Sequence, residues 1–510
     1  METKINKKLF FTLIAIILIA IFSISVSQKN LQNDTFYTIK IGEHIIENGG
    51  IDGLDPFSWH QNLEYTYPHW LYDVMIYLIY QLGGMNGIYV STCLFAIILG
   101  IVLFFTNTKL GKNKVISFVV TIGAMYMLRD YIAARAQLIT YILLVLEVLS
   151  IEQYLDTGKK RYGLTLLIIS ILIANLHVAV WPFMFVLYLP YIAEYVIAAI
   201  ERFTAHKYGK EVKQGDKLLI EYKEKTKWLI VIMLISILAG FLTPLGTTPY
   251  TYLLKTMQGN TTQNINEHLP LTLINNTDII CALIIFLALL IFTNSKIRLS
   301  DLLMLGGLTL LMLYSKRQSA IFVIIGAIIL NKILYQWMEQ CIPNIDEKMI
   351  NSLVTKFGTF MIIALVTILS LYFIKPKLQE KYIDENSYPV EMSDFILNYF
   401  EENNININDV RIYNEYNYGS YLLYRNIPVF IDSRADLYSP EFNEGIDIFT
   451  DFINSSNLSV YFEDIFDKYD ITHVLLYKNS KMNMIIQDAN LNGYKLLKSD
   501  DSFVFYEIEK

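Results

Sequence analysis

The sequence is poor in charged residues and in cysteine. Charged residues make up only 17% of the 510 residues, and only three residues are cysteine. A chain of this length with 54% apolar residues and a mean hydropathy of +0.38 is too apolar to fold around one soluble core. Cys93 and Cys281 lie in apolar runs and Cys341 in a predicted cytoplasmic connector, so we expect no external disulfide. The composition predicts a protein that crosses a membrane several times.

The motifs of several enzyme and binding classes are also absent. The sequence contains no P-loop, no dinucleotide fingerprint, no exposed GxSxG and no zinc-ligand spacing. It has no basic recognition helix, so we expect no nucleic-acid partner. A transporter usually carries ionisable residues near the middle of its spans, and the apolar runs here look mostly free of them.

About eleven apolar runs are long enough to cross the roughly 30 Å of hydrocarbon in a bilayer. They cover residues 9–26, 87–106, 115–128, 138–155, 162–175, 178–200, 228–243, 277–294, 301–314, 319–340 and 357–374. The first run follows Lys7 and Lys8 and lacks a small-residue cleavage pattern, so we expect a retained helix rather than a cleaved signal peptide. The stretch 71–82 is interpreted as an interfacial helix rather than a span.

The basic residues of the connecting loops indicate an orientation. They gather at residues 109–114, 159–161, 202–227 and 296–298, in alternate loops. Because short basic loops stay in the cytoplasm, the pattern predicts a cytoplasmic N-terminus and an external C-terminus in the plasma (inner) membrane. Five of the seven histidines then fall on the outer face, although histidine also favours interfaces for structural reasons.

The composition changes at about residue 375, where the chain becomes acidic and much less apolar. The expected fold class is a polytopic α-helical membrane domain at 1–374, with a large first outer loop at 28–84, followed by a small extracytoplasmic α/β domain at 375–510. In the latter we predict strands at 410–413, 429–432, 473–476 and 503–506 and helices at 390–401, 442–454 and 459–468. Asp432 and Arg434 follow a predicted strand, either as functional groups or as a structural ion pair.

The order of several short segments resembles the GT-C superfamily of polytopic glycosyltransferases, in particular bacterial proteins related to the dolichyl-phosphate-mannose protein mannosyltransferases (glycosyltransferase family 39-like). The segments are NDTFYTIKIGEHIIENGGIDGLDPFSW, PHWLYDV and LGG after the first span, then ARAQLITY, ANLHVAVWP, TPLGTTPY, INEHLP and SKRQSAIF, and YNYGSYLLY with PVFIDSRADLY near the C-terminus. The resemblance implies an inverting transfer of a sugar from a polyprenyl-phosphate donor to a glycan, lipid or protein acceptor on the outer face.

Such a transfer needs a carboxylate that takes the acceptor proton and cations that stabilise the departing phosphate. The resemblance places Asp34 at the acidic position of the first outer loop, as base or metal ligand. Asp55, after which Pro56 favours a turn, is a second acidic candidate or a turn cap. For the donor phosphate we nominate Arg135, Lys316 and Arg317, whose alternative role is contact with lipid headgroups. The substrate-binding candidates are His69, Trp70, Asn175, His177, Glu267 and His268.

A divalent cation such as Mg²⁺ or Mn²⁺ is compatible with oxygen ligands from Asp34, Asp55 and Glu267, but no spacing requires one. Two other functions stay open at this point. One is a non-catalytic envelope scaffold on the same fold, and the other is a flippase for lipid-linked glycans, which would tolerate the substitution Asp34→Asn.

Overall fold

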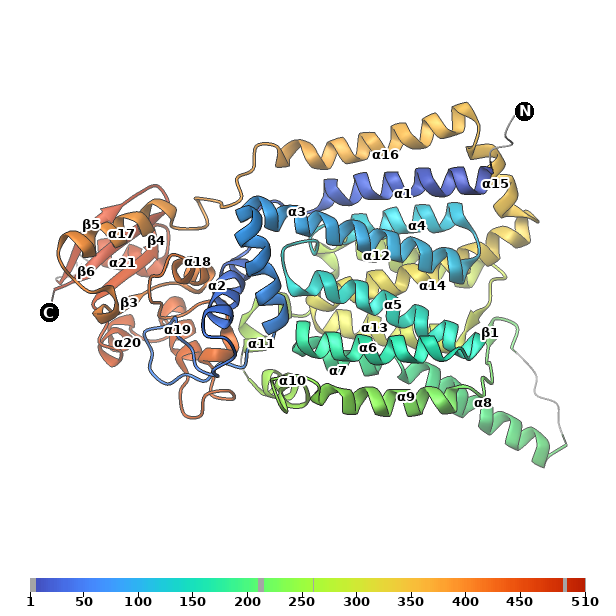
Figure 1. Cartoon of the computed structure of the whole chain (residues 1–510), viewed down its shortest axis with the longest axis horizontal. Helices are drawn as coiled ribbons and strands as arrows, with labels where there is room; N and C mark the ends of the chain where they lie inside the picture. The colour runs from blue at the N-terminus through green and yellow to red at the C-terminus, as the bar shows by residue number, and fades with distance from the viewer. Residues whose placement is uncertain (1–5, 210–214, 260, 489–492, 510) are drawn as a thin grey trace. The chain divides into compact units, whose positions relative to one another are not determined.

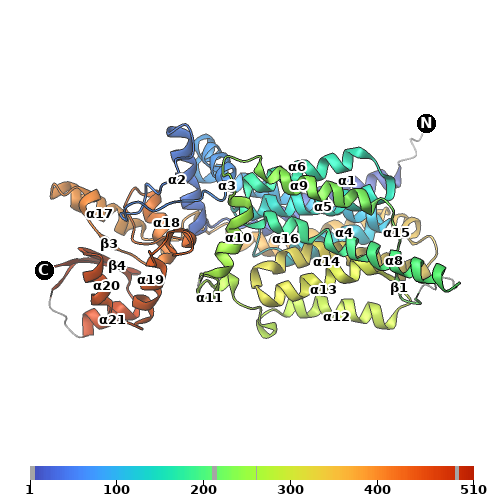
Figure 2. The same ribbon diagram turned by 90° about the horizontal axis from the view of Figure 1, so that it is seen from below.

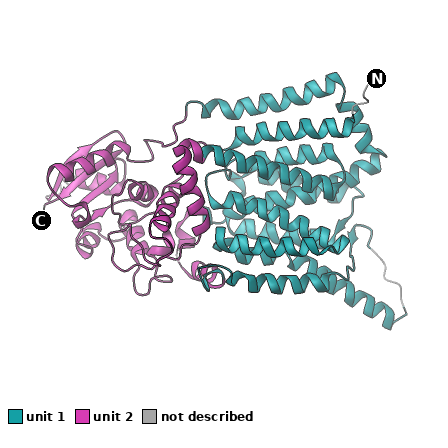
Figure 3. Ribbon diagram, viewed as in Figure 1, with its two compact units in different colours: residues 1–28, 89–249, 267–379 teal, residues 29–88, 250–266, 380–510 magenta. Residues whose placement is uncertain are grey.

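The computed structural model describes residues 6–209, 215–259, 261–488 and 493–509. They form two compact units, each built from separate stretches of the chain (Figure 3). Unit 1 comprises residues 1–28, 89–249 and 267–379, and unit 2 comprises residues 29–88, 250–266 and 380–510. Residues 210–214 of the predicted basic connector and residue 260 of the predicted outer loop lie outside the described residues.

Unit 1 is mostly helical. Six stretches among the described residues are long and apolar enough to cross a membrane: Lys7–Val26, Trp70–Gly111, Ala136–Thr157, Val178–Lys207, Lys316–Cys341 and Lys356–Lys377. Four shorter apolar stretches are Lys114–Met127, Thr226–Phe241, Thr277–Phe292 and Leu299–Tyr314. All eleven predicted runs are largely helical, whereas the number that actually cross a bilayer stays a prediction.

The helices of unit 1 lie side by side, with α1 between α16 and α4 (Figure 1). Seen from below, α13 runs along α14 (Figure 2). The helices are α1 (Lys7–Val26), α3 (Trp70–Gly111, which begins in unit 2), α4 (Lys114–Met127), α5 (Ala136–Thr157), α6 (Lys160–Leu176), α7 (Trp181–Val186), α8 (Leu189–Lys207), α9 (Thr226–Leu238), α12 (Thr277–Phe292), α13 (Leu299–Tyr314), α14 (Ser319–Cys341), α15 (Ile345–Leu353) and α16 (Lys356–Lys377). The short parallel strands β1 (Leu218–Leu219) and β2 (Ile297–Arg298) pair at one end of this unit. The most apolar windows of α5 and α14 are 78% and 72% buried, so these two helices form the centre of the bundle.

Helix α3 is interrupted at Gly84. This residue has φ 58° and ψ −147°, a conformation that side chains with a Cβ disfavour. The break separates residues 71–82, which we interpreted as an interfacial helix, from the long apolar segment that follows.

Unit 2 combines the predicted outer loop with the C-terminal segment, so the units do not follow the single predicted boundary at 374/375. Phe36 of α2 (Asn33–Glu47) lies 5.0 Å from the Tyr388 ring and 5.1 Å from the Tyr421 ring, measured between centroids. The amide of Leu31 also donates to the carbonyl of Tyr382 at 2.9 Å. Aromatic side chains of the loop thus find their buried surface in the C-terminal segment rather than among the apolar helices.

The C-terminal segment contains a four-stranded sheet in the order β3-β4-β6-β5. The strands are β3 (Ile412–Tyr413), β4 (His473–Tyr477), β5 (Tyr494–Ser499) and β6 (Phe503–Ile508). The remaining helices of unit 2 are α10 (Thr248–Gln258, which begins in unit 1), α11 (Thr261–Asn264), α17 (Val390–Glu402), α18 (Tyr416–Tyr424), α19 (Ile448–Asn457), α20 (Phe462–Lys468) and α21 (Lys481–Asp488). β3 runs parallel to β4, which pairs antiparallel with β6, so that Leu475 faces Phe505.

The predicted strand at 429–432 is not part of this sheet, and this prediction is wrong. The Asn414 side chain accepts from the amide of Phe430 at 2.8 Å and donates to the carbonyl of Ile431 at 2.7 Å. A buried carboxamide therefore satisfies the backbone groups that a neighbouring strand would otherwise bond. Only an isolated bridge between Val429 and Ser58 remains.

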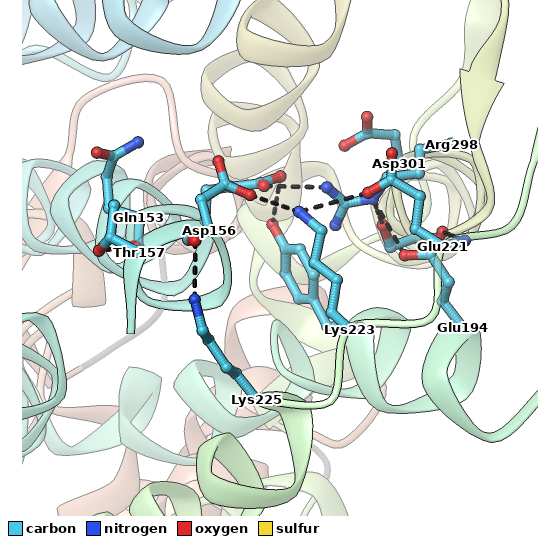
Figure 4. Close-up of polar contacts among 12 residues, drawn as sticks. Gln153, Asp156, Thr157, Glu194, Glu221, Lys223, Lys225, Arg298 and Asp301 are labelled. Carbon is cyan, nitrogen blue, oxygen red and sulfur yellow. Dashed lines mark hydrogen bonds and ion pairs between the residues drawn. The ribbon is translucent and has the colours of Figure 1, made fainter. Parts of the chain in front are cut away.

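A buried network of charged side chains joins four helices of unit 1 (Figure 4). Glu152 of α5 contacts Lys332 of α14 at 2.9 Å and Arg298 at 3.0 Å. Arg298 also contacts Glu194 of α8 at 3.0 Å, and Lys332 contacts Asp301 of α13 at 3.0 Å. The prediction that the apolar runs are mostly free of ionisable residues missed this network. Its members pair with one another, as charges in an apolar bundle must.

We expect the substitution Glu152→Gln to destabilise unit 1 by about 3 kcal/mol, because it leaves Arg298 and Lys332 buried with one partner fewer. Asp156→Asn is the matched control, since Asp156 pairs with Lys223 at 2.6 Å with half of its side chain exposed, and exposed pairs contribute about 1 kcal/mol or less. Thermal unfolding in detergent measures both variants. Equal loss of melting temperature in the two variants would contradict the role of the network.

Candidate functional site

Five of the predicted site residues gather at the N-terminal end of α5 in unit 1. Arg135 directly precedes the helix, and its Nη1 donates to Oε1 of Glu267 at 2.7 Å. Glu267 and His268 lie in a 3₁₀ turn at residues 266–268. The ion pair holds the loop that carries this turn against the start of α5.

The same loop runs beside the turn that carries Lys316 and Arg317. The amide of Lys316 donates to the carbonyl of Leu269 at 3.0 Å, and the amide of Leu271 donates to the carbonyl of Leu313 at 3.2 Å. The hydroxyl of Tyr131 adds a bond to the carbonyl of Lys316 at 3.2 Å. Backbone hydrogen bonds thus fix the two segments side by side and bring Glu267 and His268 next to the two cations.

Arg317 is positioned by α5 itself. The carboxamide of Gln137, with its oxygen toward Arg317, accepts from Nε at 2.8 Å and from Nη2 at 2.6 Å. Lys316 is exposed, whereas Arg317 is half-buried. Arg135 directly precedes the first turn of α5 and Arg317 contacts Gln137 in that turn, so both guanidiniums lie at this end of the helix, with Lys316 adjacent to Arg317 in sequence.

Asn175 lies in the last turn of α6, and His177 directly follows this helix. Nδ1 of the fully buried His177 lies 3.0 Å from the hydroxyl of Thr140, the fifth residue of α5. Nδ2 of Asn175 donates to the carbonyls of Ile171 at 2.7 Å and Leu242 at 3.0 Å. These contacts give both residues a role in the packing of α6, and their binding to a substrate stays a prediction.

His268 is neutral at pH 7 in this setting. Burial lowers its pKa to about 4, with help from the positive charges of Arg317 and Arg135, while Glu267 acts in the opposite direction. The cluster therefore carries three positive charges and one negative charge at neutral pH. A net positive site beside a helix N-terminus favours an anion such as a phosphate.

The remaining candidates lie in unit 2. Asp34 is the second residue of α2, where a negative charge is favourable at the helix N-terminus, and it is half-buried. His69 and Trp70 form the start of α3, and the carbonyl of His69 accepts from the amide of Asp73 at 2.9 Å. Asp34 thus has the partial exposure that a group acting on a substrate needs.

Asp55 has a different environment, because its side chain is fully buried and ion-paired. Nη1 of Arg434 donates to Oδ1 of Asp55 at 2.6 Å, and Nη2 of the same guanidinium donates to Asp432 at 2.6 Å. The amide of Ser58 also donates to Asp55 at 2.9 Å, as in a capped turn. Burial opposes ionisation of Asp55, but Arg434 lowers its pKa below the usual value. This geometry favours a structural role for Asp55, Asp432 and Arg434.

Two of the three residues that we considered as ligands of a divalent cation are paired with cations of the protein. Asp55 faces a guanidinium, which would repel a metal ion, and Glu267 is paired with Arg135. No group of three or more His, Cys, Asp or Glu side chains among the described residues is arranged to hold a metal. A metal ligated by Asp34 stays a prediction.

Sequence reasoning missed several residues that position the cluster. Gln137 and Thr140 follow Arg135 by two and five residues, and each contacts a residue from another segment. Their polar side chains at the start of an apolar helix were the available signal. In unit 2 the candidate residues named from the sequence do not include Asp73, whose buried carboxyl group lies beside Thr38 of α2.

Comparison with known proteins adds no assignment. The sequence matches no model of a protein family, and a search of curated proteins finds no significant match. The inference of a function therefore rests on the residues of this chain alone.

We expect Asp55→Asn to lower the stability of unit 2 by about 3–5 kcal/mol, because it leaves the Arg434 guanidinium buried with one carboxylate fewer. Asp394→Asn is the matched control, since Asp394 pairs with Arg425 at 2.6 Å with 59% of its side chain exposed. Limited proteolysis and thermal unfolding report the difference. A stable Asp55→Asn protein would show that the pair does not hold this unit together.

We expect His268 to make the protein less stable in acid. The unfolded state binds a proton at the ordinary histidine pKa of about 6.5, whereas His268 in the folded state does so only near pH 4. Stability is therefore lost as pH falls through this window. His268→Gln should remove on the order of 1 kcal/mol of the loss between pH 7 and pH 5, measured as the change in melting temperature. Identical pH profiles of the two proteins would contradict the assignment.

Proposed function

We propose that this protein is a membrane glycosyltransferase that moves a sugar from a polyprenyl-phosphate donor to an acceptor hydroxyl. The observation that supports the proposal is the cationic cluster at the start of α5, formed by Arg135, Lys316 and Arg317. It lies at the end of long apolar helices, where the phosphate of a lipid carrier meets water. Guanidinium groups match the oxygens of such a phosphate.

In the proposed reaction the phosphate is the leaving group. The acceptor oxygen forms a bond to the anomeric carbon from the face opposite the phosphate, and the bond from that carbon to the phosphate oxygen breaks. The electron pair of the broken bond stays on the phosphate, whose added negative charge the cluster stabilises. Asp34 takes the proton of the acceptor hydroxyl as general base. Attack from the opposite face inverts the anomeric configuration.

The remaining candidates take supporting roles in this proposal. Glu267 holds Arg135 in place, and the neutral His268 is available as a hydrogen-bond partner for the sugar or the phosphate. His69 and Trp70 are assigned to the acceptor or to the lipid interface. Asp55 is left out of the catalytic set because of its pairing with Arg434.

We propose that the cluster faces the outside of a bacterial plasma membrane. Arg135 precedes α5, and the basic residues Lys159, Lys160 and Arg161 follow the other end of the same helix. The positive-inside rule assigns that second end to the cytoplasm. Unit 2 is then extracytoplasmic and the N-terminus cytoplasmic.

The test compares the sugars of envelope glycans in a strain that lacks the gene and carries one variant. We expect one sugar to disappear in the deletion strain and to return with the wild-type protein. Asp34→Asn should restore less than about one hundredth of it, because a general base contributes about 10²–10⁴ in rate. Arg317→Gln should reduce transfer about tenfold or more, because hydrogen bonds to charged groups contribute about 1.5–3 kcal/mol.

Asp394→Asn serves as the control and should restore the sugar fully, since 59% of the Asp394 side chain is exposed in its pair with Arg425 and Asp394 has no role in the proposed reaction. All variants are compared at equal amounts in the membrane. Full restoration by Asp34→Asn would argue against the catalytic role and favour a flippase or a scaffold.

A further inference from the structure

A single acidic side chain, Glu147, lies in the middle of α5 without a charged partner. It is the twelfth of the 22 residues of this helix, so about 17 Å of helix separates it from the first residue. It is 0% exposed, and neither carboxyl oxygen has a hydrogen-bond partner among the described residues. No charged side chain among the described residues pairs with this carboxyl.

One hydroxyl group from another segment lies near this carboxyl, and a second lies beside the first. Tyr188, at the junction of α7 and α8, interacts electrostatically with Glu147 and lies beside Ser236 of α9. Both residues are 0% exposed. The carboxyl, the Tyr188 hydroxyl near it and the Ser236 hydroxyl beside Tyr188 are therefore polar groups from three parts of the bundle that lie in its apolar interior.

A chain of hydrogen bonds fixes the position of this group. The hydroxyl of Ser170 in α6 donates to the backbone carbonyl of Ser236 at 2.7 Å, and Nε1 of Trp181 donates to Ser170 at 3.1 Å. The segments that carry Ser236 and Tyr188 are thus tied to α6, which packs against α5. Tyr188 and Ser236 therefore lie on segments that are held in place within the fold.

Glu152, five residues further along α5, gives a direct comparison. It has the same burial, but Lys332, Arg298 and Tyr191 all contact its carboxylate. An ionised carboxylate is satisfied there. At Glu147 the same charge would be strongly unfavourable, because no cation among the described residues pairs with it.

We propose that Glu147, Tyr188 and Ser236 form a proton-binding site inside the helical unit, at which the Glu147 carboxyl reversibly takes up one proton. A proton cancels the charge without needing additional space or ligands. The neutral acid can donate to the Tyr188 hydroxyl, which can in turn donate to Ser236, so that all three polar groups are used. Tyr188 is the one titratable group that faces the carboxyl, and α6, α9 and α14 contribute no charged side chain to it among the described residues. This site is separate from the proposed sugar transfer, which uses groups at the end of α5.

The first test is infrared spectroscopy of the purified full-length protein at pH 7, in wild-type form and as Glu147→Gln. We expect the difference spectrum to contain the carbonyl band of a protonated carboxylic acid. The variant should keep the wild-type melting temperature, because Gln replaces a neutral acid of nearly the same shape. Loss of carboxylate bands in the variant, in place of the acid band, would overturn the proposal.

The second test is covalent labelling with dicyclohexylcarbodiimide, which enters apolar regions and reacts with protonated carboxyl groups. The acid adds across one C=N bond, so that its oxygen bonds to the central carbon and its proton passes to nitrogen. The adduct rearranges to an N-acylurea, which retains every atom of the reagent. Mass spectrometry of peptides from α5 then locates the label.

We expect labelling of Glu147 to exceed that of Glu152 by about tenfold or more, because the ion-paired carboxylate holds little proton at the same pH. The labelling should fall as pH rises and should vanish in Glu147→Gln. Equal labelling of the two residues in the wild-type protein would overturn the proposal.

Discussion

Helix α5 is largely enclosed by other helices, and an ionised side chain on it must therefore find a partner within the protein. Water and lipid headgroups are not available to satisfy charges along such a helix. Near one end, Glu152 is satisfied by Arg298 and Lys332, and at the other, Arg135 is satisfied by Glu267. Each solution draws in a segment that is distant in sequence. Ion pairs that start from charged residues of this one helix and of Arg135 before it therefore connect it, directly or through one further residue, to α8, α13, α14 and the loop at 267–271.

Unit 2 depends on a comparable constraint with the charges reversed. There a single buried guanidinium, that of Arg434, pairs with Asp55, which lies 379 residues earlier in the chain, and with Asp432. A lone arginine in this position would be strongly unfavourable, so the loop that carries Asp55 must be in place whenever the C-terminal segment is folded. The pairing explains why the first outer loop belongs to this unit rather than to the helices that flank it in sequence.

The sequence predicts the structure well where one local requirement, such as a long apolar run, determines it. It predicts the structure poorly where contacts between distant segments determine it. Long apolar runs are needed to cross a bilayer, so the helices were found at nearly the predicted positions. Glu147 was overlooked because one carboxyl in a run of 22 residues hardly changes its hydropathy. The segment 429–432 has the residues of a strand, and only the distant Asn414 side chain keeps it out of the sheet. The sequence indicates Arg135, Glu267 and Arg317 one at a time, whereas their grouping at the start of α5 depends on tertiary contacts.

The discontinuous make-up of unit 2 has a consequence for synthesis. Its stretches 29–88, 250–266 and 380–510 leave the ribosome in that order, separated by most of the helical unit. Domains tend to fold as they emerge, but the carboxylate of Asp55 and the aromatic face of α2 have no lasting partners until the final quarter of the chain has been made. The first outer loop must wait in an unpaired state through the insertion of nearly every helix. Folding of unit 2 can therefore be completed only after the last of its three stretches has been made.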